Sequence, residues 1–480
     1  MSLTLYNSLS GELQDFRPLD PEKVRMYSCG PTVYDYFHIG NARPFIVFDG
    51  LRRYLEFKGY DVTYVQNVTD VEDKIINRAA EEDLKPADLA QKYMDAYFKD
   101  MERLGINPTD LNPKVTDYIP QIIDHVRDLE QNGYAYSVDG DVYFRVSKFS
   151  EYGKLSGRSL DELQSGSRVE IDEAKENPLD FALWKRSSSD EPGWDSPWGR
   201  GRPGWHIECS VMANETLGDT IDIHAGGQDL IFPHHENEIA QSEARTGKQF
   251  ARYWLHNGLL QFEGQKMSKS LGNFEYAREV VDRHGKEPVR LFYFSTHYRK
   301  PLDFSEKELE DAGKAVARVY DFLQEVEDLP PSPERAGEED QLAADLRDFL
   351  QGAKEAYIAE MDKDFNTPAG LSVIFELLKK ANKVRNNTSS RGGGQTELLT
   401  RSAKMIRKLG RPLGLFQEPA ERSPGGKQEE LLQLLIDVRS ELRNQQHWEL
   451  ADEIRARLSE LGVELKDKGD STTWVFRNAS

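Results

Sequence analysis

The sequence predicts an α/β protein whose first part holds a parallel sheet and whose second part is helical. An apolar segment of strand length, Lys23–Ser28, is followed by a loop, an amphipathic helix over Pro44–Lys58 and a second apolar segment, Val62–Val68. This order of strand, loop, helix and strand indicates a right-handed βαβ unit with parallel strands. A similar apolar strand occurs at Thr220–His224, and from about Pro288 onward the pattern is helical.

The composition indicates a cytoplasmic protein with no membrane contact. Its 480 residues suffice for about three domains, and its formal net charge of −21 favours solubility and argues against indiscriminate binding of polyanions. The net charge does not exclude a local nucleic-acid site. Mean hydropathy is −0.68, no run of about 18 apolar residues is present to cross a bilayer, and no secretory signal is visible.

The loop Tyr27–Arg43 follows the first strand and so lies at the carboxyl end of the sheet, where open α/β sheets bind ligands. We expect Pro44 in the first turn of the next helix, which leaves free N–H groups and a positive dipole end for a phosphate. His38 and Asn41 can donate hydrogen bonds to that phosphate, and Gly40 lets the backbone approach it. A loop histidine beside a turn glycine is the plain alternative for His-Ile-Gly-Asn alone.

The middle of the chain predicts an insertion. Helical periodicity covers Asp73–Leu104 and Val115–Gln131. From Tyr134 to about Arg200 the pattern changes to short alternating strands, such as Asp141–Val146, joined by loops rich in Ser, Gly and Asp. We interpret this stretch as an interruption of the α/β domain.

The α/β pattern resumes after the insertion. The turn Gly226–Asp229 follows the strand Thr220–His224, and we expect a helix to begin at Pro233. Tyr253–Phe262 predicts two further short strands. Glu263–Asn273 is a basic loop bracketed by glycines.

The helical part divides into a bundle and a small terminal unit. Leu342–Met361 and Pro368–Arg385 predict paired helices. After a linker at Gln417–Lys427, the terminal unit comprises two helices and a short strand, over Glu429–Asn444, Trp448–Leu461 and Thr472–Phe476.

One segment of the bundle, Lys379–Arg411, is strongly basic and contains a single acid, Glu397. On an otherwise acidic protein this segment is the best candidate for a polyanion-binding face, with a solvated helix surface as the alternative. Its bases are Lys379, Lys380, Lys383, Arg385, Arg391, Arg401, Lys404, Arg407, Lys408 and Arg411.

Four side chains with metal-ligand chemistry recur near the predicted strand ends. His234 and Glu238 are four residues apart, so on a helix both project from one face. Cys29 and Cys209 are the only cysteines. A set of two thiols, an imidazole and a carboxylate suits Zn²⁺. Scattered core thiols beside a polar helix face are the alternative, and the competing ligands nearby are His206, His235 and Glu208.

Taken together, these segments make the chain resemble the bacterial cysteinyl-tRNA synthetases over essentially its whole length. His38–Asn41 matches the HIGH-type motif of class I synthetases with Asn in the fourth place, and Lys266–Ser270 is an unaltered KMSKS motif. Either motif alone is weak, but the pair in this order, with the family's zinc positions between, is specific. The resemblance implies a Rossmann-like parallel sheet with an insertion domain, then a helical bundle and a small C-terminal α+β anticodon-binding unit.

The resemblance also implies domain boundaries. We expect a catalytic domain over 1–111 and 201–285, an acceptor-end insertion over 112–200, a stem-contact region over 286–327, an anticodon-binding bundle over 338–416 and an anticodon-recognition unit over 428–480.

Site residues are carried over from the family at matching positions. One Zn²⁺ per chain would be held by Cys29, Cys209, His234 and Glu238. The amino-acid pocket would comprise Gly30, Thr32, Asn67, Thr69 and Trp205. ATP would be held by His38, Asn41, Gly227, Asp229 and Lys269. The catalytic groups would be His38, Asn41, Lys266 and Lys269.

The implied reaction joins L-cysteine and ATP, with Mg²⁺, into cysteinyl-adenylate and pyrophosphate, and then transfers cysteine to the 3′ end of tRNA(Cys). Positioning and neutralisation of negative charge would supply most of the catalysis. Zinc would select the thiol by more than the roughly 1–3 kcal/mol that a methylene-sized pocket difference provides, so we expect no editing site in the insertion. We expect a monomer.

Two other functions fit parts of the pattern. One is the ATP-dependent cysteine ligase of mycothiol synthesis, which resembles this family but joins cysteine to an aminosugar. The other is a non-catalytic tRNA-binding paralogue. The bundle segment Asp364–Pro368 and the terminal segments Ala451–Arg455 and Thr472–Trp474 match the anticodon-binding end of the synthetases and favour that function.

Overall fold

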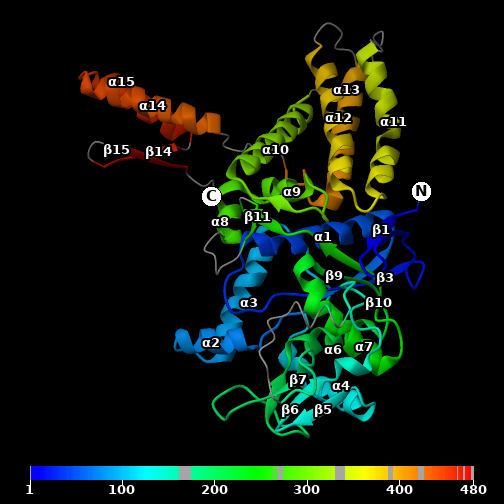
Figure 1. The fold of residues 1–480 in the computed structure, drawn as a ribbon. Coiled ribbons are helices and arrows are strands. Elements are labelled where there is room, and N and C mark those ends of the chain that lie inside the picture. Colours follow the sequence, from blue (N-terminus) through cyan, green and yellow to red (C-terminus); the bar gives the residue numbers. More distant parts are fainter. Residues whose placement is uncertain are drawn as a thin grey trace. The chain divides into compact units, whose positions relative to one another are not determined.

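The computed structural model describes residues 2–159, 162, 174–262, 264–267, 274–329, 341–387, 393–419, 426–461, 463–468 and 471–476. Its contacts divide the chain into two units, Met1–Gln417 and Glu418–Ser480. Figure 1 shows the elements of both units in chain order.

The first unit is built around a four-stranded parallel sheet with the order β10-β9-β3-β4. Its strands are β3 (Lys23–Ser28), β4 (Asp61–Gln66), β9 (Ile221–Gly227) and β10 (Ala251–Asn257). Helix α1 (Ile39–Lys58) connects β3 to β4, which confirms the predicted βαβ unit and the α/β class. Because the strands are parallel, the residues that follow β3, β4, β9 and β10 meet at one edge.

Helix α1 begins five residues earlier than we expected. His38 is the N-cap residue with extended backbone, and Ile39 donates its N–H to the carbonyl of Glu275 at 2.8 Å. This contact between distant parts of the chain fixes the first turn on the His-Ile-Gly-Asn motif itself. The prediction that Pro44 lies in the first turn is therefore wrong. Pro44 lies in the second turn, where its missing N–H removes a single helical bond.

Two predicted helices follow β4. The expected helix Asp73–Leu104 is divided into α2 (Asp73–Glu81) and α3 (Pro86–Arg103), because Asp83 has a φ of 54° and Pro86 begins the second helix. A short turn, Val115–Tyr118, leads into α4 (Ile119–Gln131).

The segment that we interpreted as an insertion holds a separate antiparallel sheet with the order β5-β6-β7-β8. Its strands are β5 (Ala135–Val138), β6 (Asp141–Phe144), β7 (Phe181–Arg186) and β8 (Gly201–Pro203). Asp139 and Gly140 form the first hairpin turn with φ values of 51° and 96°. The chain then enters α6 (Trp205–Leu217), which packs on α4 and on α7 (Glu236–Thr246).

A small sheet links the parallel sheet to the helical part. It comprises β11 (Leu260–Phe262), β12 (Gln265–Lys266) and β13 (Leu302–Asp303). Strand β13 departs from our expectation of an all-helical chain after Pro288. It lies between α9 (Lys286–Phe294), which follows α8 (Ala277–His284), and α10 (Glu306–Glu327).

The bundle and an N-terminal hairpin complete the first unit. Helix α12 (Thr367–Asn386) packs against α11 (Gln341–Met361) and α13 (Gly393–Gly410), with Leu346, Leu377 and Ile406 in the core. We did not predict the hairpin of β1 (Thr4–Asn7) and β2 (Glu12–Asp15). It is held by tertiary contacts, among them a hydrogen bond of 3.0 Å from Trp254 N to Asn7 Oδ1.

The second unit is a helical hairpin packed on a β-hairpin. It comprises α14 (Gly426–Asn444), α15 (Trp448–Glu460), β14 (Val463–Lys468) and β15 (Ser471–Phe476), of which we predicted all but β14. Its core contains Leu432, Ile436, Leu458, Val463 and Leu465. In the part of the chain that the structure describes, no helix of either unit is long and apolar enough to cross a membrane.

Candidate active site

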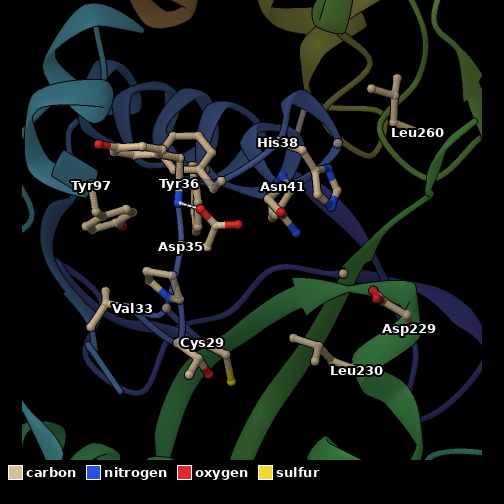
Figure 2. A pocket seen from close by; sticks show the side chains of 18 of the residues that line it. Cys29, Val33, Asp35, Tyr36, His38, Asn41, Tyr97, Asp229, Leu230 and Leu260 are labelled. Atoms are coloured by element: carbon tan, nitrogen blue, oxygen red, sulfur yellow. Dashed lines mark hydrogen bonds between the residues drawn. The ribbon is translucent and has the colours of Figure 1, made fainter. Parts of the chain in front are cut away.

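A cavity of about 650 Å³ opens at the carboxyl ends of β3, β9 and β10. Figure 2 shows its lining, which comes from the loop after β3, the start of α1 and the segment after β9. Eight of the residues that we expected to bind substrates or metal line it: Cys29, Gly30, Thr32, His38, Asn41, Trp205, Gly227 and Asp229.

Several of the residues that we expected to bind ATP lie together in the cavity. His38 and Asn41 project from the start of α1, and Asp229 faces the cavity from the segment after β9 (Figure 2). Glycine gives room to a polar side chain at two positions here. A Cβ on Gly40 would lie 2.9 Å from the His38 imidazole, and one on Gly227 would lie 2.5 Å from the Asp229 carboxylate. The missing side chains leave room for both polar groups beside the backbone.

Gly30 and Trp205, which we expected around the amino acid, line the same cavity. Gly30 donates its N–H to Asn67 Oδ1 at 2.8 Å, and a Cβ on Gly30 would lie 1.7 Å from the Asn67 carbonyl oxygen. Asn67 and Thr69 lie behind the lining. Asn67 Nδ2 donates to Thr69 Oγ1 at 3.3 Å, and Thr69 Oγ1 donates to Glu208 at 2.9 Å.

Lys74 is a cavity residue that the sequence did not reveal. Its ammonium lies 5.8 Å from the ring centroid of Tyr34 and 5.9 Å from that of Trp205. An exposed lysine near the start of a helix gives no sign in the sequence that it lines a cavity. Only the fold shows that Lys74 lines this one.

The basic loop Glu263–Asn273, called the lysine-rich loop below, begins beside the cavity. The backbone of Lys266 pairs with Gln261 of β11, and buried Met267 lines the cavity beside Gly40. The side chain of Lys266 and the whole of Lys269 lie outside the described residues. The roles of both lysines therefore stay predictions.

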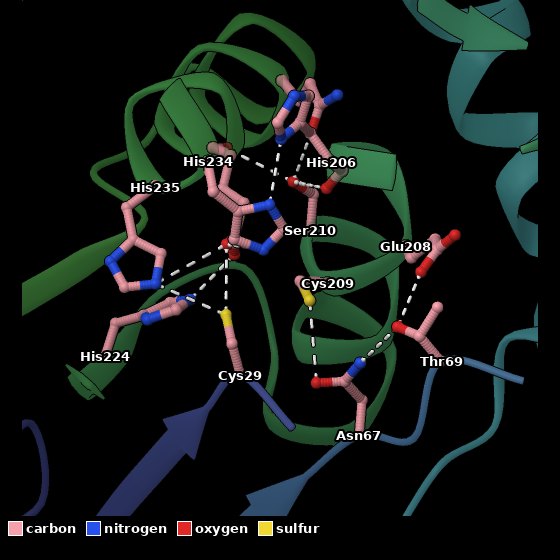
Figure 3. A network of polar contacts seen from close by, with 12 residues as sticks. Cys29, Asn67, Thr69, His206, Glu208, Cys209, Ser210, His224, His234 and His235 are labelled. Carbon is pink, nitrogen blue, oxygen red and sulfur yellow. Dashed lines mark hydrogen bonds and ion pairs between the residues drawn. The ribbon is translucent and has the colours of Figure 1, made fainter. Parts of the chain in front are cut away.

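The structure brings together the four side chains expected to bind metal. The ligating atoms of Cys29, Cys209, His234 and Glu238 all lie within 4.8 Å of one another (Figure 3). Glu238 Oε1 lies 3.0 Å from His234 Nε2 and 3.4 Å from the Cys29 sulfur. The regular helix begins at Glu236 rather than at Pro233, and the residues before it form a short π-helical segment, Ile231–His235, that is interrupted by the extended backbone of Phe232.

A second set in the same cluster, Cys29, His224, His235 and Glu238, also meets this distance criterion. His224 Nε2 lies 2.8 Å from Glu238 Oε2, and His235 Nδ1 lies 2.8 Å from His256 Nε2. We named His235 but not His224, because a single histidine within a buried strand gives no spacing signal. The two sets share Cys29 and Glu238, and only the first contains both thiols.

Neighbouring side chains hold His234, a member of the first set, in place. His206 Nδ1 lies 2.9 Å from His234 Nδ1, which leaves His234 Nε2 directed at the cluster (Figure 3). The ring centroid of Trp205 lies 4.5 Å from that of His234, so the cluster adjoins the part of the cavity that Trp205 lines. Metal-binding histidines commonly have such a partner on the second ring nitrogen.

The electrostatics of the cluster favour a cation. A hydrogen bond with Cys29 lowers the pKa of Cys209 to about 6. Burial alone would raise the pKa of Glu238, but His224 and His234 hold that pKa well below its ordinary value. Burial also opposes a charge on His234, yet Glu238 and Cys209 raise the pKa of His234 to about 10. The cluster thus contains two anionic groups, Cys209 and Glu238, whereas burial, and then Cys209 and Glu238, raise the pKa of Cys29 well above its ordinary value.

A buried hydroxyl beside the thiols is compatible with a metal. The hydroxyl of Tyr27 is fully buried and has no partner of ordinary hydrogen-bond geometry among the described residues, but it lies close enough to the Cys209 sulfur for a weak hydrogen bond. Burial raises the pKa of Tyr27, and the charges of Cys209, Cys29 and Glu238 raise it further, which places the hydroxyl near the cluster. A metal-bound thiolate would accept its proton in a hydrogen bond. The donor set and this hydroxyl both suit zinc.

Ion pairs with nearby acids neutralise part of the positive charge that the sequence indicated for the basic segment Lys379–Arg411. Arg385 forms an ion pair with Glu325 at 2.9 Å, and Arg407 pairs with Glu327 at 3.0 Å, both on α10. Lys379 lies 3.1 Å from Glu376. Arg391 lies outside the described residues. These acids come from outside Lys379–Arg411, so the composition of that segment alone overstated its positive charge.

Comparison with known proteins identifies two families along the chain. Residues 15–314 match the class I (C) tRNA synthetase catalytic domain, and residues 356–417 match the DALR domain. A cysteine–tRNA ligase from Carboxydothermus hydrogenoformans is 48% identical over 472 residues, which cover 98% of this chain and 99% of that protein.

Solved structures share the fold at low sequence identity. Methionyl-tRNA synthetase from Mycobacterium tuberculosis, in complex with methionyl-adenylate, superposes with a TM-score of 0.63 at 17% identity, over 82% of this chain and 91% of that one. LeuRS from Agrobacterium radiobacter K84 gives 0.59 at 12% identity, over 83% and 85%. These two matches show the fold alone. The near full-length match at 48% identity shows more: the chain belongs to the cysteinyl-tRNA synthetases, the cysteine–tRNA ligase family of class I aminoacyl-tRNA synthetases.

Proposed function

We propose that the chain attaches L-cysteine to tRNA(Cys) in two steps. Cysteine and ATP first form cysteinyl-adenylate and pyrophosphate, and the cysteinyl group then passes to the 3′ end of the tRNA. The observation that carries this proposal is the cluster of two thiols, an imidazole and a carboxylate beside a nucleotide-sized cavity, in a member of this family.

In the first step the carboxylate of cysteine attacks the α-phosphorus of ATP, and pyrophosphate leaves. No covalent enzyme intermediate is needed, so positioning and neutralisation of charge supply the catalysis. His38 and Asn41 hold the phosphates from the first turn of α1, and Asp229 holds the nucleotide from the segment after β9. Lys266 and Lys269 neutralise the charge that develops on the leaving pyrophosphate, together with Mg²⁺.

The amino acid binds under Trp205, with Gly30, Thr32, Asn67 and Thr69 around it. Cys29, Cys209, His234 and Glu238 would hold one Zn²⁺. The metal would supply a soft Lewis acid that favours a thiol over the harder hydroxyl of serine. Selection at this point makes an editing site unnecessary, so we assign the insertion 112–200 to the acceptor end of the tRNA.

The remaining parts of the chain bind the rest of the tRNA. Residues 286–327 contact the stem, the bundle over 338–416 binds the anticodon arm, and the unit over 428–480 recognises the anticodon. The match of residues 356–417 to the DALR domain supports the second of these roles. The enzyme acts as a monomer in the cytoplasm.

Charging of a tRNA(Cys) transcript by the full-length chain tests this proposal. We expect charging with labelled cysteine and not with serine, and one zinc per chain by metal analysis. A folded, zinc-loaded chain that charges the transcript with neither amino acid contradicts it.

A further inference from the structure

Arg43 is a fully buried cation that the proposed function does not use. It lies on α1, two residues after Asn41. Its guanidinium donates four hydrogen bonds, all of them to backbone carbonyls. One terminal nitrogen bonds to Gly258 at 2.8 Å and Leu259 at 2.9 Å, and the other bonds to Tyr298 at 3.3 Å and Lys300 at 2.6 Å.

No carboxylate in the described part of the chain forms an ion pair with this charge. None of the ion pairs among the described residues involves Arg43, its Nε has no partner there, and burial lowers the pKa of the guanidinium to about 10. A buried charge without an ionic partner is costly, and an apolar side chain would be cheaper for stability alone. A planar guanidinium, however, can hold several carbonyl oxygens in fixed directions, which a lysine ammonium does not do.

The carbonyls that Arg43 binds belong to two loops beside the nucleotide end of the cavity. Gly258 and Leu259 line the cavity and lead directly into β11, which pairs with the start of the lysine-rich loop. Tyr298 and Lys300 lie on the second loop, which packs against the first. A Cβ on Gly258 would lie 2.4 Å from the Lys300 carbonyl oxygen.

We propose that Arg43 is a positioning residue for the nucleotide. It fixes the first turn of α1, with His38 and Asn41, relative to the cavity wall formed by Asn257–Leu260. Strand β12, at the start of the lysine-rich loop, shares this placement because it pairs with β11. The inference rests on the proposed function, since it assigns ATP to this end of the cavity. The cysteine pocket under Trp205 shares no hydrogen bond with Arg43.

The test measures pyrophosphate exchange into ATP at varied ATP and varied cysteine for Arg43→Met and Arg43→Lys. Because a misplacement of about 1 Å can lower a rate roughly 100-fold, we expect kcat/KM for ATP to fall roughly 10- to 100-fold in both variants, with a higher KM for ATP. The KM for cysteine should stay near its wild-type value. The lysine retains the charge but not the planar fork, so loss in both variants assigns the effect to geometry.

Arg290 offers a matched control. It is also fully buried, and it donates to the carbonyls of Leu413, Leu104 and Gly105 and to Asp49, none of which lines the cavity. We expect Arg290→Met and Arg290→Lys to lower the thermal midpoint, as the Arg43 variants do, but to leave the KM for ATP unchanged.

A second variant, Gly258→Ala, should also move the cavity wall relative to α1. Its Cβ pushes the two loops apart without removing a charge. It should also raise the KM for ATP selectively, and it keeps the inference testable if the Arg43 variants fail to fold. Equal losses for ATP and cysteine, or Arg43 and Gly258 variants that lose only stability, overturn the inference. Absence of exchange in the wild-type chain instead overturns the proposed function.

Discussion

His125 on α4 is held neutral by its surroundings. It is fully buried, its Nε2 lies 3.2 Å from the carbonyl of Gln241 on α7, and its Nδ1 lies 3.3 Å from the guanidinium of Arg245. The carbonyl must accept from Nε2–H, and the guanidinium must donate to Nδ1, so both contacts require the neutral ring. Burial, and then the charge of Arg245, lower the pKa of His125 to about 3.

This depressed pKa predicts a loss of stability in acid. The unfolded chain takes up a proton on His125 below about pH 6.5 and the folded chain does not until about pH 3, so stability is lost as the pH falls between these values. At pH 5 the loss is about 2 kcal/mol, at about 1.4 kcal/mol per pH unit. Urea unfolding of wild type and His125→Gln from pH 7.5 to 5 measures it. Parallel pH profiles for the two proteins would contradict this account.

Some site residues were accessible from the sequence and others were not. Cys29 and Cys209 stood out because the chain has no other cysteine, and His234 and Glu238 because of their spacing. His224, Lys74 and the hydroxyl of Tyr27 gave no signal. Their places depend on which strands and helices become neighbours, and a local pattern does not record that.

Helix α1 and the loop between α11 and α12 also depend on tertiary contacts that a local sequence pattern does not record. The periodicity of α1 was evident, but its start was set by a hydrogen bond from Ile39 to Glu275, far along the chain. The loop after α11 holds Asp364 at a φ of 62°. Asp364 accepts hydrogen bonds from Tyr6 N at 2.8 Å, the Tyr298 hydroxyl at 2.9 Å and Arg299 Nε at 2.6 Å. One carboxylate thus joins the bundle to β1 and to the loop that Arg43 binds.

Substitution of Asp364 separates its charge from its backbone conformation. Asp364→Asn should cost about 2 kcal/mol, because it weakens charge-assisted hydrogen bonds but keeps a side chain that tolerates a positive φ. Asp364→Ala should cost about 4 kcal/mol, since it leaves buried donors without a partner and strains the backbone. Chemical unfolding of the two variants gives these free energies. Equal stability of both variants and wild type would show that the loop does not depend on this carboxylate.

At the scale of the whole molecule, the chain divides at Gln417. The parallel sheet, the added antiparallel sheet and the helical bundle followed from periodicity and the order of elements. The β1–β2 hairpin, β13 and β14 did not, because short strands are recognised only together with the strands that they pair with. The lysine-rich loop was identified from its motif alone, and its lysine side chains lie outside the described residues.

The division predicts a separation of the two reaction steps. Deletion of the chain after about Arg422 should leave adenylate formation intact, because the cavity and the metal cluster lie in the first unit. The same deletion should strongly reduce tRNA charging. Pyrophosphate exchange and tRNA charging by the truncated and full-length chains measure the two steps. Equal loss of both activities would contradict this division.

The central claim is that a metal at Cys29, Cys209, His234 and Glu238 selects the substrate by its thiol. Pyrophosphate exchange into ATP with cysteine or serine, before and after removal of zinc, tests it most directly. We predict exchange with cysteine only, abolished by chelation and by Cys209→Ser, and restored to the wild-type chain by added zinc. Exchange with cysteine that survives complete removal of the metal, or equal exchange with serine, would contradict the claim.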